Sequence, residues 1–142
     1  MNCAKELLDI LSASLSPVIA VFAVWIAFQQ KKINEERFKH DLFDKRYAMY
    51  ESTKELFRHV LVGDEIKRNN LDDYRYATKG SIFIFSSKTS SYLNEVYTNS
   101  LKLNASIKNK NMDEDLFDWF VSEFDQIDDR FMGELKINME LL

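Results

Sequence analysis

The pattern of apolar and charged positions divides the chain into an uncharged N-terminal run and a longer, charged remainder. Residues 10–28 contain no Asp, Glu, Lys or Arg, and Gln29-Gln30-Lys31-Lys32 follows directly. A helix of this length is roughly 28 Å long, close to the ~30 Å hydrocarbon core of a bilayer. The sequence therefore predicts an N-terminal transmembrane segment at residues 1–28, with the span at about 10–28.

Two other interpretations of this run fit less well. A cleaved signal peptide needs small residues near the cleavage site, whereas the run ends in Trp25-Ile26-Ala27-Phe28. A buried helix of a soluble protein rarely extends over so many uncharged residues. Four basic residues lie just after the run and only Lys5 precedes it, so the positive-inside rule places the N-terminus outside and the C-terminal part in the cytoplasm.

Small residues recur along one face of the predicted span, at spacings of four, four, three and four. Small side chains allow two helices to approach closely, and serine hydroxyls can hydrogen-bond across the contact. The stripe predicts self-association of the spans, although the same residues can also fill a span that makes no contact. Its members are Ser12, Ser16, Ala20, Ala23 and Ala27.

Pro17 is the only proline in the chain. It lacks a backbone donor and should kink or weaken a helix near Ala13. Alternatively, Ser16 caps a new helix that begins at Pro17, and residues 4–15 lie along the outer membrane surface. That alternative leaves only a short segment to cross the bilayer.

Residues 29–142 are predicted to form one cytoplasmic helical domain of about four helices, which makes the whole chain all-α. No Gly or Pro interrupts residues 18–62, so one helix should continue from the span to a stop at Gly63. Apolar residues at three- and four-residue spacing form a seam on this helix and another on the last helix, which is predicted from Asp113 to the chain end. The seams contain Phe43, Tyr47, Tyr50, Phe57 and Leu61, and Phe117, Phe120, Phe124, Ile127, Phe131 and Leu135.

Between these helices the pattern is less regular. Asp72-Asp73 should begin a short helix that ends near Thr78, and a helix is expected over about 88–107, followed by a loop at 109–111. Residues 82–85, Ile-Phe-Ile-Phe, have the composition of a strand. Because no partner strand is evident, we expect them to form the buried end of a helix.

The run Asp41-Leu42-Phe43-Asp44-Lys45-Arg46-Tyr47-Ala48-Met49-Tyr50-Glu51 carries a resemblance to a known group. It resembles a family of small, largely uncharacterised bacterial single-span membrane proteins with an "LFDKR-aromatic-x-x-Tyr" run after the span. The order of features at 82–85 and 91–95 is also similar to that of the family's central helices. The resemblance implies a bacterial or phage-related protein of the cell inner membrane, and it implies no particular chemistry.

Two clusters are candidates for ligand binding. Ser86, Ser87, Lys88 and Thr89 stand at a predicted helix start, where free N–H groups, hydroxyls and one ammonium suit a phosphate, although such residues are more often helix caps. The missing glycines exclude a P-loop. Arg46 and Tyr50, one helical turn apart, could hold an anion or a partner's carboxylate. A charge cluster that clamps two helices is the simpler interpretation.

The sequence offers little chemistry beyond these clusters. His40 and His59 have no Cys or second His at metal-ligand spacing, so neither a metal site nor a cofactor is expected. No nucleophile or oxyanion site accompanies the carboxylates, so we do not expect an enzyme. With 19 Lys+Arg against 23 Asp+Glu, a net charge of −4, extended nucleic acid is also an unfavourable partner.

Two functions remain. In the first, the chain is a membrane-anchored, homo-oligomeric effector whose cytoplasmic domain senses a small phosphate-containing ligand or a protein partner and acts on the lipid bilayer. This plan is analogous to that of membrane effectors of antiphage defence, including those gated by cyclic oligoadenylates, and the analogy rests on architecture alone. In the second, the chain is a membrane-tethered scaffold that binds a cytoplasmic protein through its helical seams.

Overall fold

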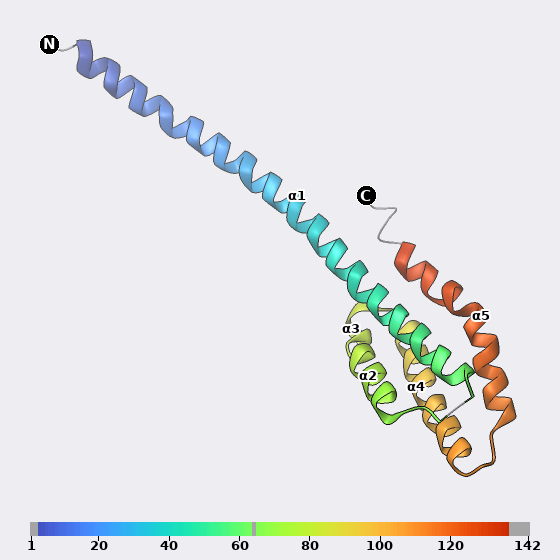
Figure 1. Ribbon diagram of the computed structural model, residues 1–142. Helices are drawn as coiled ribbons and strands as arrows, with labels where there is room; N and C mark the ends of the chain where they lie inside the picture. The colour runs from blue at the N-terminus through green and yellow to red at the C-terminus, as the bar shows by residue number, and fades with distance from the viewer. Residues whose placement is uncertain (1–2, 64, 137–142) are drawn as a thin grey trace. The chain divides into compact units, whose positions relative to one another are not determined.

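The computed structural model describes residues 3–63 and 65–136, and within the first helix it leaves out the side chains of residues 3–8, 10–14 and 16. The described residues form helices joined by short connections and include no strand, which confirms the all-α prediction (Figure 1). The helices are α1 Cys3–Leu61, α2 Arg68–Thr78, α3 Ser81–Ile84, α4 Ser87–Lys108 and α5 Glu114–Lys136.

The chain divides into two compact units, Met1–His40 (unit 1) and Asp41–Leu142 (unit 2). Helix α1 contributes residues to both units, and its assignment continues through Pro17. The alternative in which a new helix begins at Pro17 is therefore not what the chain adopts. Five of the six preceding side chains, at positions 11–14 and 16, lie outside the description.

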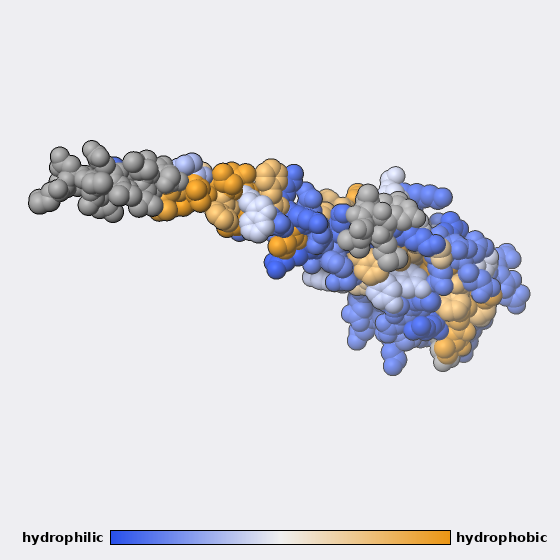
Figure 2. Space-filling view, turned by 90° about the horizontal axis from the view of Figure 1, so that it is seen from above, coloured by the Kyte–Doolittle hydropathy of each residue, from blue (hydrophilic) through white to orange (hydrophobic). Residues whose placement is uncertain are grey.

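The apolar side chains that the structure describes in the stretch from Leu15 to Phe28 of unit 1 are exposed. The large apolar residues between Leu15 and Phe28 are all about half exposed or more, up to 70 % at Val21 and Phe28. Figure 2 shows this stretch as an apolar surface that begins beside the grey residues and gives way to a hydrophilic one. The predicted span at 10–28 begins among residues whose side chains are not described. Within the part of the chain that the structure describes, no helix is both long and apolar enough to cross a bilayer.

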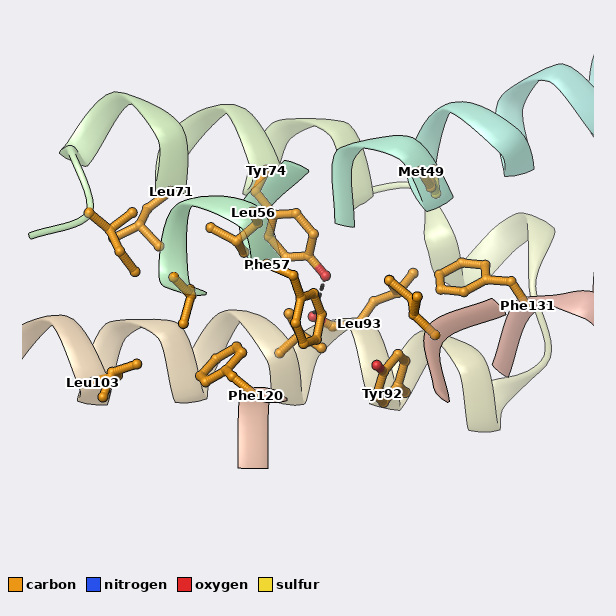
Figure 3. Packing of buried hydrophobic residues seen from close by; sticks show 14 of the residues in the cluster. Met49, Leu56, Phe57, Leu71, Tyr74, Tyr92, Leu93, Leu103, Phe120 and Phe131 are labelled. Atoms are coloured by element: carbon orange, nitrogen blue, oxygen red, sulfur yellow. Dashed lines mark hydrogen bonds between the residues drawn. The ribbon is translucent and has the colours of Figure 1, made fainter. Parts of the chain in front are cut away.

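Unit 2 has its own hydrophobic core, built from α1, α2, α4 and α5, with α4 in contact with α2, α3 and α5. Phe57 and Phe120 meet edge to face with ring centroids 5.3 Å apart (Figure 3). Phe131 packs in the same way against Phe85, with ring centroids 5.6 Å apart. The buried Tyr74 hydroxyl donates to the Leu93 carbonyl oxygen at 3.0 Å. The seam predicted on the last helix therefore supplies much of this core, with Phe120, Ile127 and Phe131 buried. The seam predicted on the first helix is correct only in part, because Phe57 is buried and Tyr50 packs against the core, but Tyr47 is 45 % exposed.

Local signals explain where the helices end. Gly63 has a φ of 77°, and its N–H donates to the Val60 carbonyl oxygen at 3.0 Å, so the predicted stop of α1 is confirmed. Lys110 adopts a φ of 56° in the predicted loop after α4. The Asp113 carboxylate accepts from the Leu116 N–H at 3.0 Å and caps the beginning of α5. The last helix was predicted to reach the chain end, but residues 137–142 lie outside the part of the chain that the structure describes.

The prediction for residues 82–85 is correct in its secondary structure, but its burial is correct only for Phe85 and, in part, for Ile84. Ser81–Ile84 form the short helix α3, and Phe85 is buried. Ile82 and Phe83 are 68 % and 87 % exposed, so they face outward. A helix of one turn can bury only one side, and here the buried positions are Ser81 and Phe85.

Candidate functional site

The beginning of α4 is the place where the sequence predicts a phosphate ligand. Ser86 is the N-cap, and its hydroxyl accepts from the Thr89 N–H at 3.4 Å. The Glu134 carboxylate of α5 reaches the same place, where its Oε1 accepts from the Ser86 N–H at 3.0 Å and from the Thr89 hydroxyl at 3.1 Å. A carboxylate of the chain itself therefore holds the position in which a phosphate was expected.

Arg46 links three helices of unit 2. Its Nε donates to the Ile84 carbonyl oxygen at 2.7 Å, and its NH1 donates to the Glu134 carbonyl oxygen at 2.6 Å. Its NH2 lies 3.7 Å from the Glu134 carboxylate, and its guanidinium is 5.5 Å from the centre of the Phe85 ring. The guanidinium of Arg46 thus donates to the end of α3 and to α5. These contacts agree with the interpretation of Arg46 as part of a charge cluster that holds helices together.

The environment of Glu134 favours its charged form. Burial acts to raise the pKa of the carboxyl, but the hydrogen bonds from Ser86 and Thr89 and the charge of Arg46 outweigh it, and the pKa lies below its ordinary value. We refer to the set Arg46, Ser86, Thr89 and Glu134 as the Arg46–Glu134 clamp. It joins α1, α4 and α5.

Tyr50 also binds a carboxylate of its own chain. Its hydroxyl donates to Asp128 Oδ1 at 2.6 Å and accepts from the Lys54 ammonium at 2.7 Å. Burial and the bond to Asp128 raise the pKa of the Tyr50 hydroxyl, and the same bond lowers the pKa of the Asp128 carboxyl. Arg46 and Tyr50 therefore contact α5 at separate places, Arg46 at Glu134 and Tyr50 at Asp128.

A pocket of about 580 Å³ opens beside the clamp, between α4 and α5. We call it the α4–α5 pocket. Its charged lining is balanced, with Lys88 and Arg130 against Asp129 and Glu134. Such a lining does not favour an anion over a cation or a zwitterion. Ser87 is exposed and is not among its lining residues.

Two buried polar atoms lie at the inner side of this region. Neither the Tyr92 hydroxyl nor Glu123 Oε2 has a hydrogen-bond partner among the described residues. Arg130 donates to Glu123 Oε1 at 2.7 Å, and its guanidinium stands 5.0 Å from the centre of the Tyr92 ring. Burial and the nearby Glu123 carboxylate raise the pKa of Tyr92, so its hydroxyl keeps its proton at neutral pH and is available as a donor.

The alanines of the small-residue stripe and the two histidines are all exposed. Ala20, Ala23 and Ala27 are exposed on α1, and the side chains of Ser12 and Ser16 lie outside the description. His40 and His59 are both exposed. Among the residues described, no group of three or more His, Cys, Asp or Glu is arranged to hold a metal ion.

Sequence reasoning missed the carboxylates of α5 that organise the site. Glu123 lies three residues after Phe120 and four before Ile127, and Glu134 lies three after Phe131. Both therefore lie on the apolar face of the helix, where an acidic side chain needs a partner. That signal was present in the sequence, but nothing local indicates that the partners are Arg130, Arg46 and the beginning of α4.

Comparisons of the chain with protein-family models, with curated proteins and with solved structures find no match.

Proposed function

We propose that the chain is a membrane-anchored, homo-oligomeric effector. The apolar part of α1 is its anchor, and unit 2 is a cytoplasmic domain that senses a small anionic ligand and acts through the anchor on the cell inner membrane. The proposal depends on one observation above all: from Leu15 to Phe28, α1 has no charged residue and exposes its large apolar side chains.

Such a surface is unfavourable in water. Burying one large apolar side chain contributes about 1.5–3 kcal/mol, and this stretch contains nine that are about half exposed or more. An exposed apolar surface of this size is typical of a site that binds lipid or another protein. Lipid is the partner we favour, because the uncharged run is long for a protein contact and is followed directly by Lys31 and Lys32.

The small residues of α1 support self-association in the membrane. Ala20, Ala23 and Ala27 lie on one face and leave the helix backbone accessible to a second copy. The bulky Phe22, Trp25 and Ile26 suit contact with lipid. An oligomer formed in this way provides the means for an effector to perturb the bilayer.

The Arg46–Glu134 clamp supports a sensing role for unit 2. Through Arg46, the positions of α3 and α5 are linked to α1, which is the helix that carries the apolar segment. A ligand that moves α3 or α5 would therefore alter contacts of α1 directly. Antiphage defence, with a nucleotide-type trigger, is the biological setting that we propose, on architectural analogy alone.

A specific observation favours the second candidate, a membrane-tethered adaptor. Tyr76, Ile82 and Phe83 of unit 2 are 84 %, 68 % and 87 % exposed. Exposed aromatic residues such as Tyr76 and Phe83 often become buried when proteins bind one another. An adaptor would use them to hold a cytoplasmic protein, and would have no effect on the membrane by itself.

The test uses the full chain, expressed in bacterial cells. We expect it to remain in the membrane fraction after an alkaline carbonate wash, to cross-link to itself, and to depolarise cells when its trigger is present. Release into the wash would contradict the membrane anchor. A chain that stays in the membrane, is harmless under all conditions and co-purifies with one protein in fixed ratio would favour the adaptor, and a Phe83→Ser variant should then lose that protein.

A further inference from the structure

We infer that a groove between α2 and α4 binds the phosphate group of a small ligand. This inference deepens the proposed function, on which it rests for the biological role of the ligand. The groove, called here the α2–α4 groove, has a volume of about 470 Å³ and is lined by the end of α2, by α3 and by the first half of α4. The lining residues on which the inference depends are Arg75, Lys79, Ser81, Ser91, Asn94 and Tyr97.

The charge of the α2–α4 groove is of one sign. Arg75 and Lys79 line it, and no Asp or Glu does, although the whole chain has a net charge of −4. Lys79 forms no ion pair within the described part of the chain. In the α4–α5 pocket, by contrast, Glu134 and Asp129 offset the cations. Of the two, only the α2–α4 groove presents uncompensated positive charge to an anion.

Arg75 is held in place before any ligand arrives. Its guanidinium lies 5.3 Å from the centre of the Tyr97 ring, and its NH1 donates to the Tyr97 hydroxyl at 3.3 Å. The other guanidinium N–H groups remain available for a phosphate, which this planar fork of donors can bind with two parallel hydrogen bonds. A side chain that is already ordered loses less entropy when it binds.

Neutral donors complete the lining. The hydroxyls of Ser81 and Ser90 are 3.0 Å apart and tie α3 to α4. Ser91 and Asn94 are exposed, and their side chains can donate to phosphate oxygens. Ile82, which also lines the groove, offers an apolar surface to the rest of the ligand. The groove is of the size usual for small-molecule sites, so we expect an organic phosphate, either a soluble nucleotide or a lipid with a phosphate headgroup.

The test is a titration of the full chain in a neutral non-ionic detergent, followed by the backbone amide signals in NMR. The soluble probes are adenosine monophosphate and inorganic pyrophosphate. The lipid probe is a short-chain phosphatidic acid, with short-chain phosphatidylcholine as its control. Binding in the α2–α4 groove should shift the amides of residues 78–82 and 90–94.

Four variants locate the site. Lys79→Glu and Asn94→Asp each place a negative charge in the groove and should weaken binding at least about tenfold. Lys102→Glu and Asn99→Asp make the same changes outside the groove on α4 and should alter the dissociation constant by no more than about twofold, since exposed charges at a distance are screened. Lys79 and Asn94 are exposed, so both variants should fold, and unchanged amide signals elsewhere would verify this.

A fifth variant, Lys88→Glu, separates the groove from the beginning of α4. Loss of binding with Lys88→Glu and retention with Lys79→Glu would overturn the inference, as would the absence of binding to all the phosphate probes. Binding of only one of the two organic probes would support the inference. AMP alone would indicate a soluble nucleotide as the ligand, and phosphatidic acid alone would indicate a lipid. Release of the chain from membranes would contradict the proposed anchor and leave the titration unaffected, so the two failures are distinguishable.

Discussion

Two of the phenylalanines of helix α1, Phe28 and Phe57, lie in opposite surroundings. Phe28 in unit 1 is 70 % exposed, whereas Phe57 in unit 2 is fully buried against Phe120 and Phe124. The same helix thus carries, among the residues that the structure describes, one exposed apolar surface and another whose Phe57 is fully buried. The comparison teaches that one helix can combine a segment of exposed apolar side chains with a segment whose apolar side chains belong to a core.

Arginines on α1 differ in the same way. Arg37 in unit 1 is exposed, whereas Arg46 in unit 2 donates to two backbone carbonyl oxygens and lies beside the Glu134 carboxylate. Exposed charges contribute little to stability, but a partly buried hydrogen-bonded charge fixes the helices around it. The two regions are therefore expected to respond very differently to equivalent substitutions.

The largest expected difference is between Phe57→Ala and Phe28→Ala. Removing the buried ring should lower the free energy of unfolding of unit 2 by about 3–5 kcal/mol, because a cavity remains beside Phe120. Removing the exposed ring should change it by less than about 0.5 kcal/mol. Urea denaturation of the full chain in detergent, followed by circular dichroism, measures both. Equal effects of the two changes would contradict the exposure of the Phe28 ring.

The hydrophobic pattern was sufficient to predict most of the fold. The three- and four-residue spacing on α5 gave Phe120, Ile127 and Phe131, all of which are buried. Gly63 indicated the end of α1, because glycine has no Cβ and adopts a positive φ without a steric penalty. The apolar face of a helix and the residue that ends it depend on neighbours in the sequence, so the sequence alone can predict them.

The candidate site was predicted only in part. The N-cap role of Ser86 follows from the sequence, but the anion on that helix end is Glu134, 48 residues away. The outward direction of Ile82 and Phe83 likewise depends on how α3 packs against α4 and α1, which composition does not reveal. The α2–α4 groove brings together α2 and α4 side chains, and no motif in the sequence joins them.

A second prediction compares Arg46→Met with Arg37→Met on the same helix. Arg46→Met keeps most of the apolar stem but removes the Arg46 donors from two carbonyl oxygens and the positive charge beside the Glu134 carboxylate, which keeps only its bonds from Ser86 and Thr89. We expect a loss of about 2–3 kcal/mol in the free energy of unfolding of unit 2. Arg37→Met should change it by less than about 0.5 kcal/mol. A small effect at Arg46 would mean that water replaces its hydrogen bonds without cost.

A third prediction concerns the exposed apolar part of unit 1. Changing Ala20 and Ala23 together to Ile should weaken self-association by about 1–2 kcal/mol, because branched side chains keep the two helix backbones apart. Val21→Ile and Val24→Ile add bulk outside the small-residue stripe and serve as the matched control. Sedimentation equilibrium in detergent measures the association. An oligomer that survives the Ala replacements unchanged would rule out the stripe as the contact.

The smallest effect should be the dependence of the Arg46–Glu134 clamp on pH. The pKa of the Glu134 carboxyl is lowered below its ordinary value of 4.5 in the folded chain. Its contribution to stability is therefore fully present above pH 4.5 and is lost as the pH falls through the lowered pKa. Wild type should exceed Glu134→Gln in the free energy of unfolding at neutral pH, and the difference should shrink as the solution becomes more acidic than pH 4.5.

The matched control for this pH series is Asp72→Asn. Asp72 lies 3.8 Å from Arg68, and both side chains are largely exposed, so removing this ion pair should change the free energy of unfolding by less than about 0.5 kcal/mol at neutral pH. Urea denaturation at several pH values compares the two substitutions. A constant difference between wild type and Glu134→Gln across the acid range would mean that the Glu134 side chain stabilises unit 2 by packing. The charge of Glu134 would then not be the reason why this residue stabilises unit 2 more than the exposed Asp72 does.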